Sequence, residues 1–178
     1  MKEKGWEIVY KKHGDLYPDI MPRIKKYAKI FRKHKYKKIL DLGCGTGRNT
    51  LFFAQEGFLV YALDASKTGI AITKKKAKKL GLQNINYKVE DTKHTSYPDN
   101  FFDAIICIFV LSHGLLKDNQ EAVDEIYRIL KPKGMLVTEF MSIKDARKKG
   151  FGKLLMNEFT KWSKSKKATK IRLGVRMN

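Results

Sequence analysis

The spacing of hydrophobic residues along the chain predicts a regular alternation of helices and strands. Apolar side chains recur at helical spacing over residues 21–38, where the apolar face consists of Ile24, Tyr27, Ala28 and Phe31. The same periodicity predicts further helices at residues 50–55, 66–80 and 119–130. Short apolar runs bounded by turn residues predict strands at residues 39–42, 58–63, 85–89, 102–111 and 135–140.

The order of these elements indicates the fold class. Strands that alternate with helices form parallel sheets covered by helices, so we expect an α/β fold with a doubly wound, mostly parallel sheet. The run 102–111 is almost continuously apolar, as is typical of a central strand that is buried on both faces. Turn residues mark the boundaries: Ser66 is suited to begin a helix, and Gly57, Gly81 and the Lys-Pro-Lys-Gly segment 131–134 are suited to end one.

The composition is that of a single globular domain. The chain has 178 residues, of which 43% are hydrophobic and 11% are aromatic. It contains no apolar run of membrane-spanning length, and the opening MKEKGWEIVYKKHG lacks the apolar stretch of a signal peptide, so we expect a cytoplasmic protein. Two cysteines, and four histidines without metal-ligand spacing, favour neither a disulfide framework nor a metal site.

The net charge of +20 is concentrated at the two ends of the chain. Residues 1–40 carry 13 Lys and Arg against 4 Asp and Glu, residues 144–178 carry 12 against 2, and the middle is nearly neutral. The basic ends are suited to bind nucleic acid or another polyanion. Alternatively, they reflect a general preference for lysine, which accounts for 31 of the 38 positive residues, whereas base recognition relies on arginine.

The sequence ILDLGCGTG, followed by a helix and a second strand, predicts a nucleoside-binding turn. Its small residues let the backbone turn sharply between strand and helix and approach a ligand closely. Asp64 stands at the end of the next strand, 17 residues after Gly47, where a carboxylate can accept both hydroxyls of a ribose. An ordinary Rossmann domain that binds another nucleotide would share these features.

Two residues indicate which nucleoside is bound. The dinucleotide-binding fingerprint has Gly or Ala at its sixth position, and Arg48 stands there instead. Asp41, two residues before Gly43, would repel a pyrophosphate but would suit an ammonium group. A cofactor with a nucleoside at one end and an amino acid at the other satisfies both conditions, which predicts S-adenosylmethionine.

Residues 5–143 resemble class I S-adenosylmethionine-dependent methyltransferases. The resemblance rests on DLGCGTG, on Asp64 and Asp91 after the second and third strands, and on the segments FFDAIICIFVLSHG and ILKPKGMLVTEF. It implies a Rossmann-like fold and methyl transfer, with the glycine turn at the methionine part of the cofactor, Asp64 at the ribose and Asp91 at the adenine amino group. The cofactor-binding residues that it implies are Asp41, Gly43, Cys44, Gly45, Gly47, Asp64, Ala65, Asp91, Thr92 and Ile108.

The opening GWEIVYKKHGDLY resembles the N-terminal lid of small-molecule methyltransferases, which closes over the cofactor. Trp6, Tyr10 and Tyr17 are candidates for the wall of the pocket, although aromatic residues at this spacing are equally consistent with a core. Methyl transfer from a sulfonium depends mainly on in-line positioning in a dry pocket. Where an acceptor needs a general base, His113 is the candidate, and the alternative for it is a hydrogen-bonded loop anchor.

Two missing motifs narrow the classes of methyl acceptor that the sequence predicts. Amino-group DNA methylases of this family carry an Asn/Asp/Ser-Pro-Pro-aromatic loop after the fourth strand, where this chain has Leu-Ser-His-Gly at 111–114. The Pro-Cys nucleophile of cytosine C5 methylases is also missing, because Cys107 follows Ile106 in the middle of a strand. We therefore expect a small or medium-sized acceptor, and the alternative is an RNA methyltransferase or nucleic-acid binder that uses the basic ends.

The C-terminal segment 142–178 resembles the coenzyme A-binding motif of GNAT-type N-acetyltransferases. The matching pattern is RKKGFG at 147–152, an apolar helix, and a strand at 171–175. In that family the amides of the loop bind the coenzyme A pyrophosphate. Because the other acetyltransferase strands are missing, we expect this helix and strand to replace the usual C-terminal edge of the sheet beside the fifth strand. Residual binding of coenzyme A or phosphate is the alternative.

The predicted organisation has three parts. A lid and a basic helix occupy 1–38, the cofactor-binding core occupies 39–143, and a basic helix–strand tail at 144–178 packs on the same domain. A non-catalytic chimera that keeps cofactor binding remains a third hypothesis for the whole chain.

Overall fold

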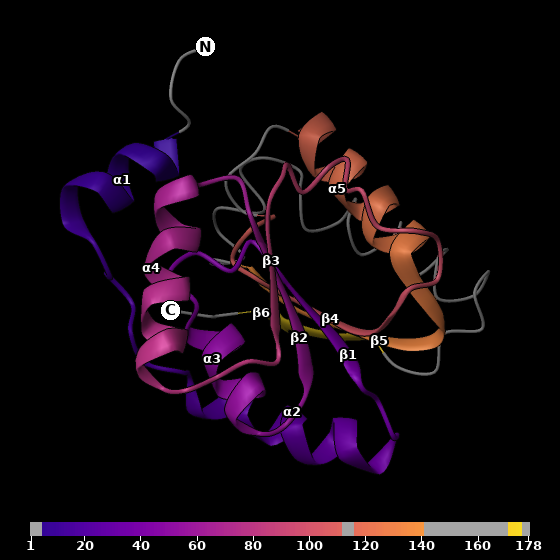
Figure 1. Cartoon of the computed structure of the whole chain (residues 1–178). Coiled ribbons are helices and arrows are strands. Elements are labelled where there is room, and N and C mark those ends of the chain that lie inside the picture. Colours follow the sequence, from indigo (N-terminus) through magenta and orange to yellow (C-terminus); the bar gives the residue numbers. More distant parts are fainter. Residues whose placement is uncertain (1–4, 112–115, 141–170, 176–178) are drawn as a thin grey trace. The chain divides into compact units, whose positions relative to one another are not determined.

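The computed structural model describes residues 5–111, 116–140 and 171–175, and Figure 1 shows the course of the chain. The chain divides into two compact units, Met1–Thr92 and Lys93–Asn178. Each unit combines parallel strands with helices, which confirms the α/β architecture expected from the sequence. None of the helices in the described ranges is long and apolar enough to cross a membrane.

The first unit contains three parallel strands with β2 in the middle, paired with β1 on one side and with β3 on the other. The strands are β1 (Lys38–Leu42), β2 (Leu59–Asp64) and β3 (Ile85–Val89). The helices are α1 (Gly5–His13), α2 (Pro22–Lys33), α3 (Arg48–Gln55) and α4 (Lys67–Lys79). α3 and α4 pack against the strands, α2 packs against α3, and α1 packs against α4.

The buried face of α2 is the one that its apolar spacing predicted. It consists of Ile24, Tyr27, Ala28 and Phe31. The ring centroid of Phe31 lies 5.5 Å from that of Phe53 in α3 and 6.0 Å from that of Phe58, just before β2. Aromatic packing of this kind adds to the burial of apolar surface and fixes α2 to the rest of the unit.

The end of α2 differs from the prediction, whereas the ends of α4 agree with it. Lys35 adopts a φ of 57°, which a right-handed helix cannot contain, so α2 ends at Lys33 and not at residue 38. The Ser66 hydroxyl accepts a hydrogen bond from the N–H of Gly69 at 3.0 Å and caps α4. After α4, Gly81 has a φ of 66°, the left-handed conformation that ends many helices.

The second unit also contains three parallel strands, with β5 in the middle. Its elements are β4 (Phe102–Ile108), α5 (Leu116–Ile129), β5 (Leu130–Phe140) and β6 (Ile171–Val175). β5 pairs in parallel with β4 and with β6, so the strand predicted at 171–175 does lie beside the fifth strand. The glycine loop and helix predicted between them lie outside the described residues.

β4 is buried as predicted but is shorter. The side chains of Ala104, Ile105 and Cys107 are fully buried, as expected for a strand covered on both faces. The strand ends at Ile108 and not at residue 111, because Phe109 has a φ of 64°, outside the extended range.

β5 begins earlier than predicted. The segment 131–134 was expected to separate α5 from the strand, but the strand already begins at Leu130. The pairing with β4 shifts between Phe102 and Ala104, so that Leu130 and Met135 oppose nearly adjacent residues of β4. The Lys-Pro-Lys-Gly segment therefore forms an irregular bulge within the strand and does not precede it.

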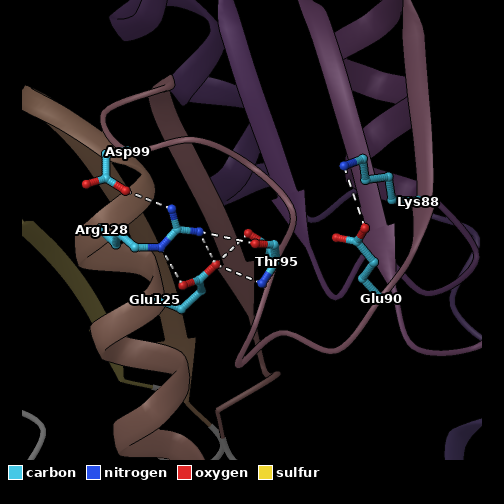
Figure 2. A network of polar contacts seen from close by, with 6 residues as sticks. All are labelled: Lys88, Glu90, Thr95, Asp99, Glu125 and Arg128. Carbon is cyan, nitrogen blue, oxygen red and sulfur yellow. Dashed lines mark hydrogen bonds and ion pairs between the residues drawn. The ribbon is translucent and has the colours of Figure 1, made fainter.

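An ionic network ties the loop before β4 to α5 (Figure 2). The Arg128 guanidinium donates to both carboxylate oxygens of Glu125 at 2.7 and 2.9 Å, to Asp99 at 2.8 Å and to the carbonyl of Thr95 at 3.2 Å. Glu125 also accepts from the N–H and the hydroxyl of Thr95, at 2.8 and 2.6 Å. Burial opposes the charge of Glu125, but the hydrogen bonds from Arg128 and Thr95 outweigh it and lower the pKa of this carboxyl.

Candidate functional site

The first unit brings three of the predicted site segments to one edge of its sheet. Because β1, β2 and β3 are parallel, their carboxyl ends lie along the same edge. The register pairs the last residue of β1 with Leu63, and Asp64 with Val89. The glycine turn 43–47 follows β1 directly, and Asp91 follows β3 by two residues. The structure therefore gathers at this edge the residues that were predicted to bind methionine, ribose and adenine.

The glycine turn has the backbone that its sequence predicted. Gly43, Gly45 and Gly47 have φ values of 71°, 56° and 86°, in the left-handed region that favours glycine. The N–H groups of Gly43 and the following residue donate to the carbonyl of Leu63 at 2.8 and 2.9 Å, which anchors the turn to β2. A Cβ added to Gly47 would lie 2.5 Å from Cγ2 of Thr73, so α4 approaches the turn as closely as glycine permits.

Asp64 presents a buried carboxylate at the end of β2. It accepts hydrogen bonds from the N–H groups of Gly45 and Ser66, both at 2.8 Å, and the residue is only 8% exposed. Burial raises the pKa of Asp64, against the opposing effect of these two hydrogen bonds. A carboxylate has about four acceptor positions, and the hydrogen bonds from described residues fill only part of them. This arrangement suits a pair of adjacent hydroxyl groups.

Asp41 lies within β1 and holds the first turn of α3. Its carboxylate accepts from the hydroxyl of Thr50 at 2.6 Å and from the amide of Asn49 at 3.4 Å. Burial raises the pKa of Asp41 to about 6, although both hydrogen bonds oppose the shift. Oδ1 of Asn49 is buried too, and no donor within the described residues reaches it. The predicted contact of Asp41 with an ammonium group stays a prediction.

The end of β3 carries the remaining acidic residues of the edge. The N–H of Glu90 donates to the carbonyl of Asp64 at 3.2 Å, which keeps the ends of β2 and β3 together. The Glu90 carboxylate pairs with Lys88 at 3.6 Å (Figure 2). Asp91 and Thr92 follow and are half-buried. The predicted contact of Asp91 with the adenine amino group and the predicted cofactor-binding role of Thr92 stay predictions.

The other predicted site residues fall into different surroundings. Ala65 is exposed beside the end of β2. Cys44 is buried in the glycine turn, and burial raises the pKa of its thiol. Ile108 is the buried last residue of β4 in the second unit. The candidate base His113 lies outside the described residues, and so does the loop around it.

The aromatic residues of the N-terminal segment do not belong to the buried core. Trp6 is 37% and Tyr17 57% exposed, and α1 has no buried residue. Tyr10 reaches the glycine turn, because a Cβ added to Gly45 would lie 2.6 Å from its hydroxyl. Burial and the nearby charge of Asp64 raise the pKa of Tyr10. The interpretation as core residues is therefore wrong for Trp6 and Tyr17, and Tyr10 is half-buried against the glycine turn.

Sequence reasoning missed the charged residues that tie the N-terminal segment to this edge. Glu7 accepts hydrogen bonds at the start of α4. Asp15 accepts from the hydroxyl of Thr46 and from Lys76, each at 2.6 Å, and Lys76 also donates to the carbonyl of Thr46 at 3.1 Å. Single charged residues in a polar segment have no periodicity, so the sequence offered no signal for these contacts.

The comparison with protein families settles the classification. A family profile described as a methyltransferase domain matches residues 40–138, more than half of the chain. The chain belongs to this methyltransferase domain family. The match begins in β1 and ends in β5, and it includes the glycine turn, Asp64 and Asp91.

The relatives of this methyltransferase domain are longer than the chain. The ubiquinone/menaquinone biosynthesis C-methyltransferase of Pectobacterium atrosepticum is 35% identical over 109 residues, which cover 58% of this chain and 43% of that relative. A SAM-dependent methyltransferase structure from Methanosarcina mazei is 28% identical with a TM-score of 0.57, and the match covers 67% of this chain and 57% of that one.

A third comparison bears on the fold alone. The match to the structure of a protein from Pyrococcus horikoshii covers 85% of this chain and 69% of that one, with 24% identity and a TM-score of 0.64. The Rossmann-like methyltransferase fold predicted from the sequence is thereby confirmed.

Proposed function

We propose that this methyltransferase domain binds S-adenosylmethionine at the carboxyl edge of β1, β2 and β3 and transfers the methyl group to a small or medium-sized acceptor. The observation that carries the proposal is the buried carboxylate of Asp64 beside the glycine turn, whose acceptor positions are only partly filled by the described residues. Family membership and the likeness to the SAM-dependent methyltransferase of Methanosarcina mazei support it.

The residues at this edge fit the cofactor. The open acceptor positions of Asp64 match adjacent ribose hydroxyls, and Asp91 is the candidate acceptor for the adenine amino group. The glycine turn permits close approach of the methionine part, because its residues carry no Cβ. Asp41 and the buried Oδ1 of Asn49 offer acceptors suited to an ammonium group. When bound, the cofactor would supply an electrophilic sulfonium methyl.

The contribution of the chain to the reaction is mainly positional. Methyl transfer requires an in-line approach and a site from which water is excluded. Cys44, Ala65, Thr92 and Ile108 are proposed to line the cofactor site. Where the acceptor must lose a proton, His113 is the proposed general base, on the sequence alone.

The proposed acceptor is a small organic molecule. The relative from Pectobacterium atrosepticum is named for ubiquinone and menaquinone biosynthesis, which favours this class of acceptor over a macromolecule. The missing DNA-methylase motifs favour it as well. We expect the reaction to take place in the cytoplasm.

The basic surface supports a second candidate function, RNA methylation or nucleic-acid binding. Exposed lysines line α2 and α4, among them Lys25, Lys29, Lys74 and Lys78. Binding between lysines and phosphates weakens steeply as the salt concentration rises. RNA binding whose affinity does not change with salt would therefore refute this candidate function. The same titration with coenzyme A and inorganic phosphate tests the residual anion binding proposed for residues 147–152.

The direct test is calorimetric titration with S-adenosylhomocysteine, the demethylated cofactor. Asp64→Ala removes the proposed hydrogen bonds to ribose and should weaken binding by about tenfold to a hundredfold, because hydrogen bonds to a charged group contribute about 1.5–3 kcal/mol. Asp19→Asn is the matched control, since Asp19 is an exposed carboxylate of the same unit. Equal affinity in Asp64→Ala and in the unsubstituted protein would refute the ribose assignment.

A screen of small acceptors with radiolabelled cofactor then separates an enzyme from a non-catalytic chimera. Transfer of label to a small molecule supports the proposed function. Binding of S-adenosylhomocysteine without transfer to any acceptor would favour the non-catalytic chimera.

A further inference from the structure

The start of α4 is bound by a carboxylate from α1. Ser66 donates its hydroxyl to Glu7 at 2.6 Å, and Thr68 donates its N–H at 3.1 Å and its hydroxyl at 2.7 Å. Hydrogen bonds from Ser66 and Thr68 lower the pKa of Glu7 to about 2, so the group is ionised at neutral pH. A carboxylate at a helix N-terminus also interacts favourably with the helix dipole.

The same serine connects Glu7 to the candidate site. The N–H of Ser66 donates to Asp64 at 2.8 Å, while the Ser66 hydroxyl caps α4 and donates to Glu7. Only two residues lie between Asp64, the proposed ribose-binding residue, and the start of α4. Glu7 is therefore joined to the ribose-binding carboxylate through a single residue.

Tyr10 is placed over the glycine turn by the same helix. It lies almost one turn after Glu7, and its ring also approaches Gly69, where an added Cβ would lie 3.3 Å from Cδ2 of Tyr10. Its hydroxyl occupies the space that a side chain at Gly45 would need. The two glycines, one in the turn and one in α4, leave room for this ring.

Packing alone does not explain the position of α1. The helix has nine residues and none of them is buried, whereas isolated helices of this length are unstable in water. Polar contacts therefore help to hold it, and those of the described residues include Glu7 at the start of α4, and Asp15 with Thr46 and Lys76 just after α1. Asp15 contacts Thr46 in the glycine turn, and Glu7 contacts Ser66, two residues after Asp64.

We propose that Tyr10 is a wall residue of the methyl-donor pocket and that Glu7 is the positioning residue that holds it there by bridging α1 to α4. The inference rests on the proposed function, because it assigns Tyr10 to the pocket of that cofactor. The Tyr10 hydroxyl hydrogen-bonds the bound cofactor beside Gly45. Glu7 touches neither cofactor nor acceptor and acts through Tyr10.

Trp6 provides a reporter of the position of α1. Its ring stacks on Tyr10 with a centroid distance of 5.5 Å, and Trp162→Phe leaves it as the sole tryptophan of the chain. In this background, Glu7→Gln should increase the quenching of Trp6 fluorescence by acrylamide without ligand, because it removes the charge that binds α4. Asp19→Asn should leave quenching unchanged. Unchanged quenching in Glu7→Gln would overturn the role of Glu7.

The affinity for S-adenosylhomocysteine tests the role of Tyr10. Glu7→Gln should weaken binding by about tenfold, because apparent affinity falls with the fraction of molecules in the competent state. Tyr10→Phe should weaken it by about threefold to tenfold, the value of one hydrogen bond, with quenching unchanged. A purely structural role would lower the melting temperature of both variants and leave their affinity intact, which would overturn the inference.

The two proposals fail in different ways. If the unsubstituted chain does not bind S-adenosylhomocysteine, the proposed function fails, and the assignment of Tyr10 fails with it. If the chain binds it with the same affinity in the presence and absence of the Tyr10 hydroxyl, the function stands and only the inference about Tyr10 is refuted.

Discussion

Two buried aspartates of the first unit and Glu125 of the second unit are held in opposite ways. In the second unit, Glu125 accepts hydrogen bonds from the charged guanidinium of Arg128, and its pKa is lowered (Figure 2). In the first unit, Asp41 and Asp64 are buried, and the hydrogen bonds that they accept from described residues come from neutral donors. The pKa of both aspartates is raised.

This difference separates a structural group from a candidate functional one. Burying a carboxylate without a cation beside it lowers stability, because the lost hydration is not replaced by an opposite charge. Arg128 compensates Glu125 and fixes a loop. Among the described residues, neither Asp41 nor Asp64 accepts a hydrogen bond from a cation; the charge of Arg48 acts on Asp41, but burial outweighs it. Both aspartates lie at a sheet edge where α/β folds bind ligands. We propose that a bound ligand satisfies their charge.

Gly47→Ala in the glycine turn has the largest expected effect on the stability of the first unit. Gly47→Ala should destabilise the first unit by about 3 kcal/mol, because a left-handed φ costs about 1–2 kcal/mol and the added Cβ overlaps Thr73. The free energy of unfolding in urea measures the loss. Gly57→Ala is the matched control: its φ of 88° is similar, but nothing lies within 4 Å of the added Cβ. Equal losses would show that close approach of α4 does not shape the turn.

The pH dependence of stability tests whether Asp41 is uncompensated. Its folded pKa of about 6 exceeds its ordinary value of 3.8, so the native state keeps a proton that the unfolded chain releases. Its favourable contribution is complete below the ordinary value and is lost as the pH rises through about 6, a change of about 3 kcal/mol. Asp41→Asn, which cannot titrate, should not show this decline.

The effect of Asp41 is measured as the difference in unfolding free energy between the unsubstituted chain and Asp41→Asn. Glu7 contributes in the opposite sense, because its pKa is lowered and its contribution is lost only as the pH falls toward about 2. That contribution is present in both proteins and cancels. If the stabilities of the unsubstituted chain and of Asp41→Asn run parallel from pH 4 to about 6, a cation such as Arg48 compensates the charge of Asp41.

The sequence predicted the fold well because the fold depends on periodic burial. The apolar face of α2, the Ser66 cap and the buried strand β4 follow from local spacing and capping chemistry. Two of the wrong boundaries lie where single residues take left-handed backbone, at Lys35 and Phe109. Neither residue type favours that conformation, so tertiary structure must select it, and no local pattern announces it.

The candidate site was predicted in part for a similar reason. The glycine turn, Asp64 and Asp91 are recognisable because strand ends and glycines fix their positions along the chain. Glu7 and Asp15 contact residues about 30 to 60 positions away, and those contacts depend on how α1 packs against α4. Only the structure could reveal them.

Arg128→Met removes the cation of the second unit and retains its apolar stem. We expect a loss of about 2 kcal/mol, because Glu125 stays buried after losing its charged donor. The midpoint of urea unfolding measures it. Arg32→Met is the control, since Arg32 forms an exposed ion pair with Glu56 and should lose less than about 1 kcal/mol. Similar losses in both variants would show that the Arg128 network stabilises the protein no more than an exposed ion pair does.

Lys88→Met has the smallest expected effect on stability. Lys88 pairs with Glu90 at 3.6 Å, and the two side chains are 34% and 26% exposed, so solvent screens the pair (Figure 2). We expect a loss of about 0.5 kcal/mol or less in urea unfolding, decreasing further in high salt. Arg128→Met, which removes a cation with several charged hydrogen bonds, should keep most of its loss in high salt. If Lys88→Met lost as much, the Arg128 network would be no more stabilising than a half-exposed ion pair.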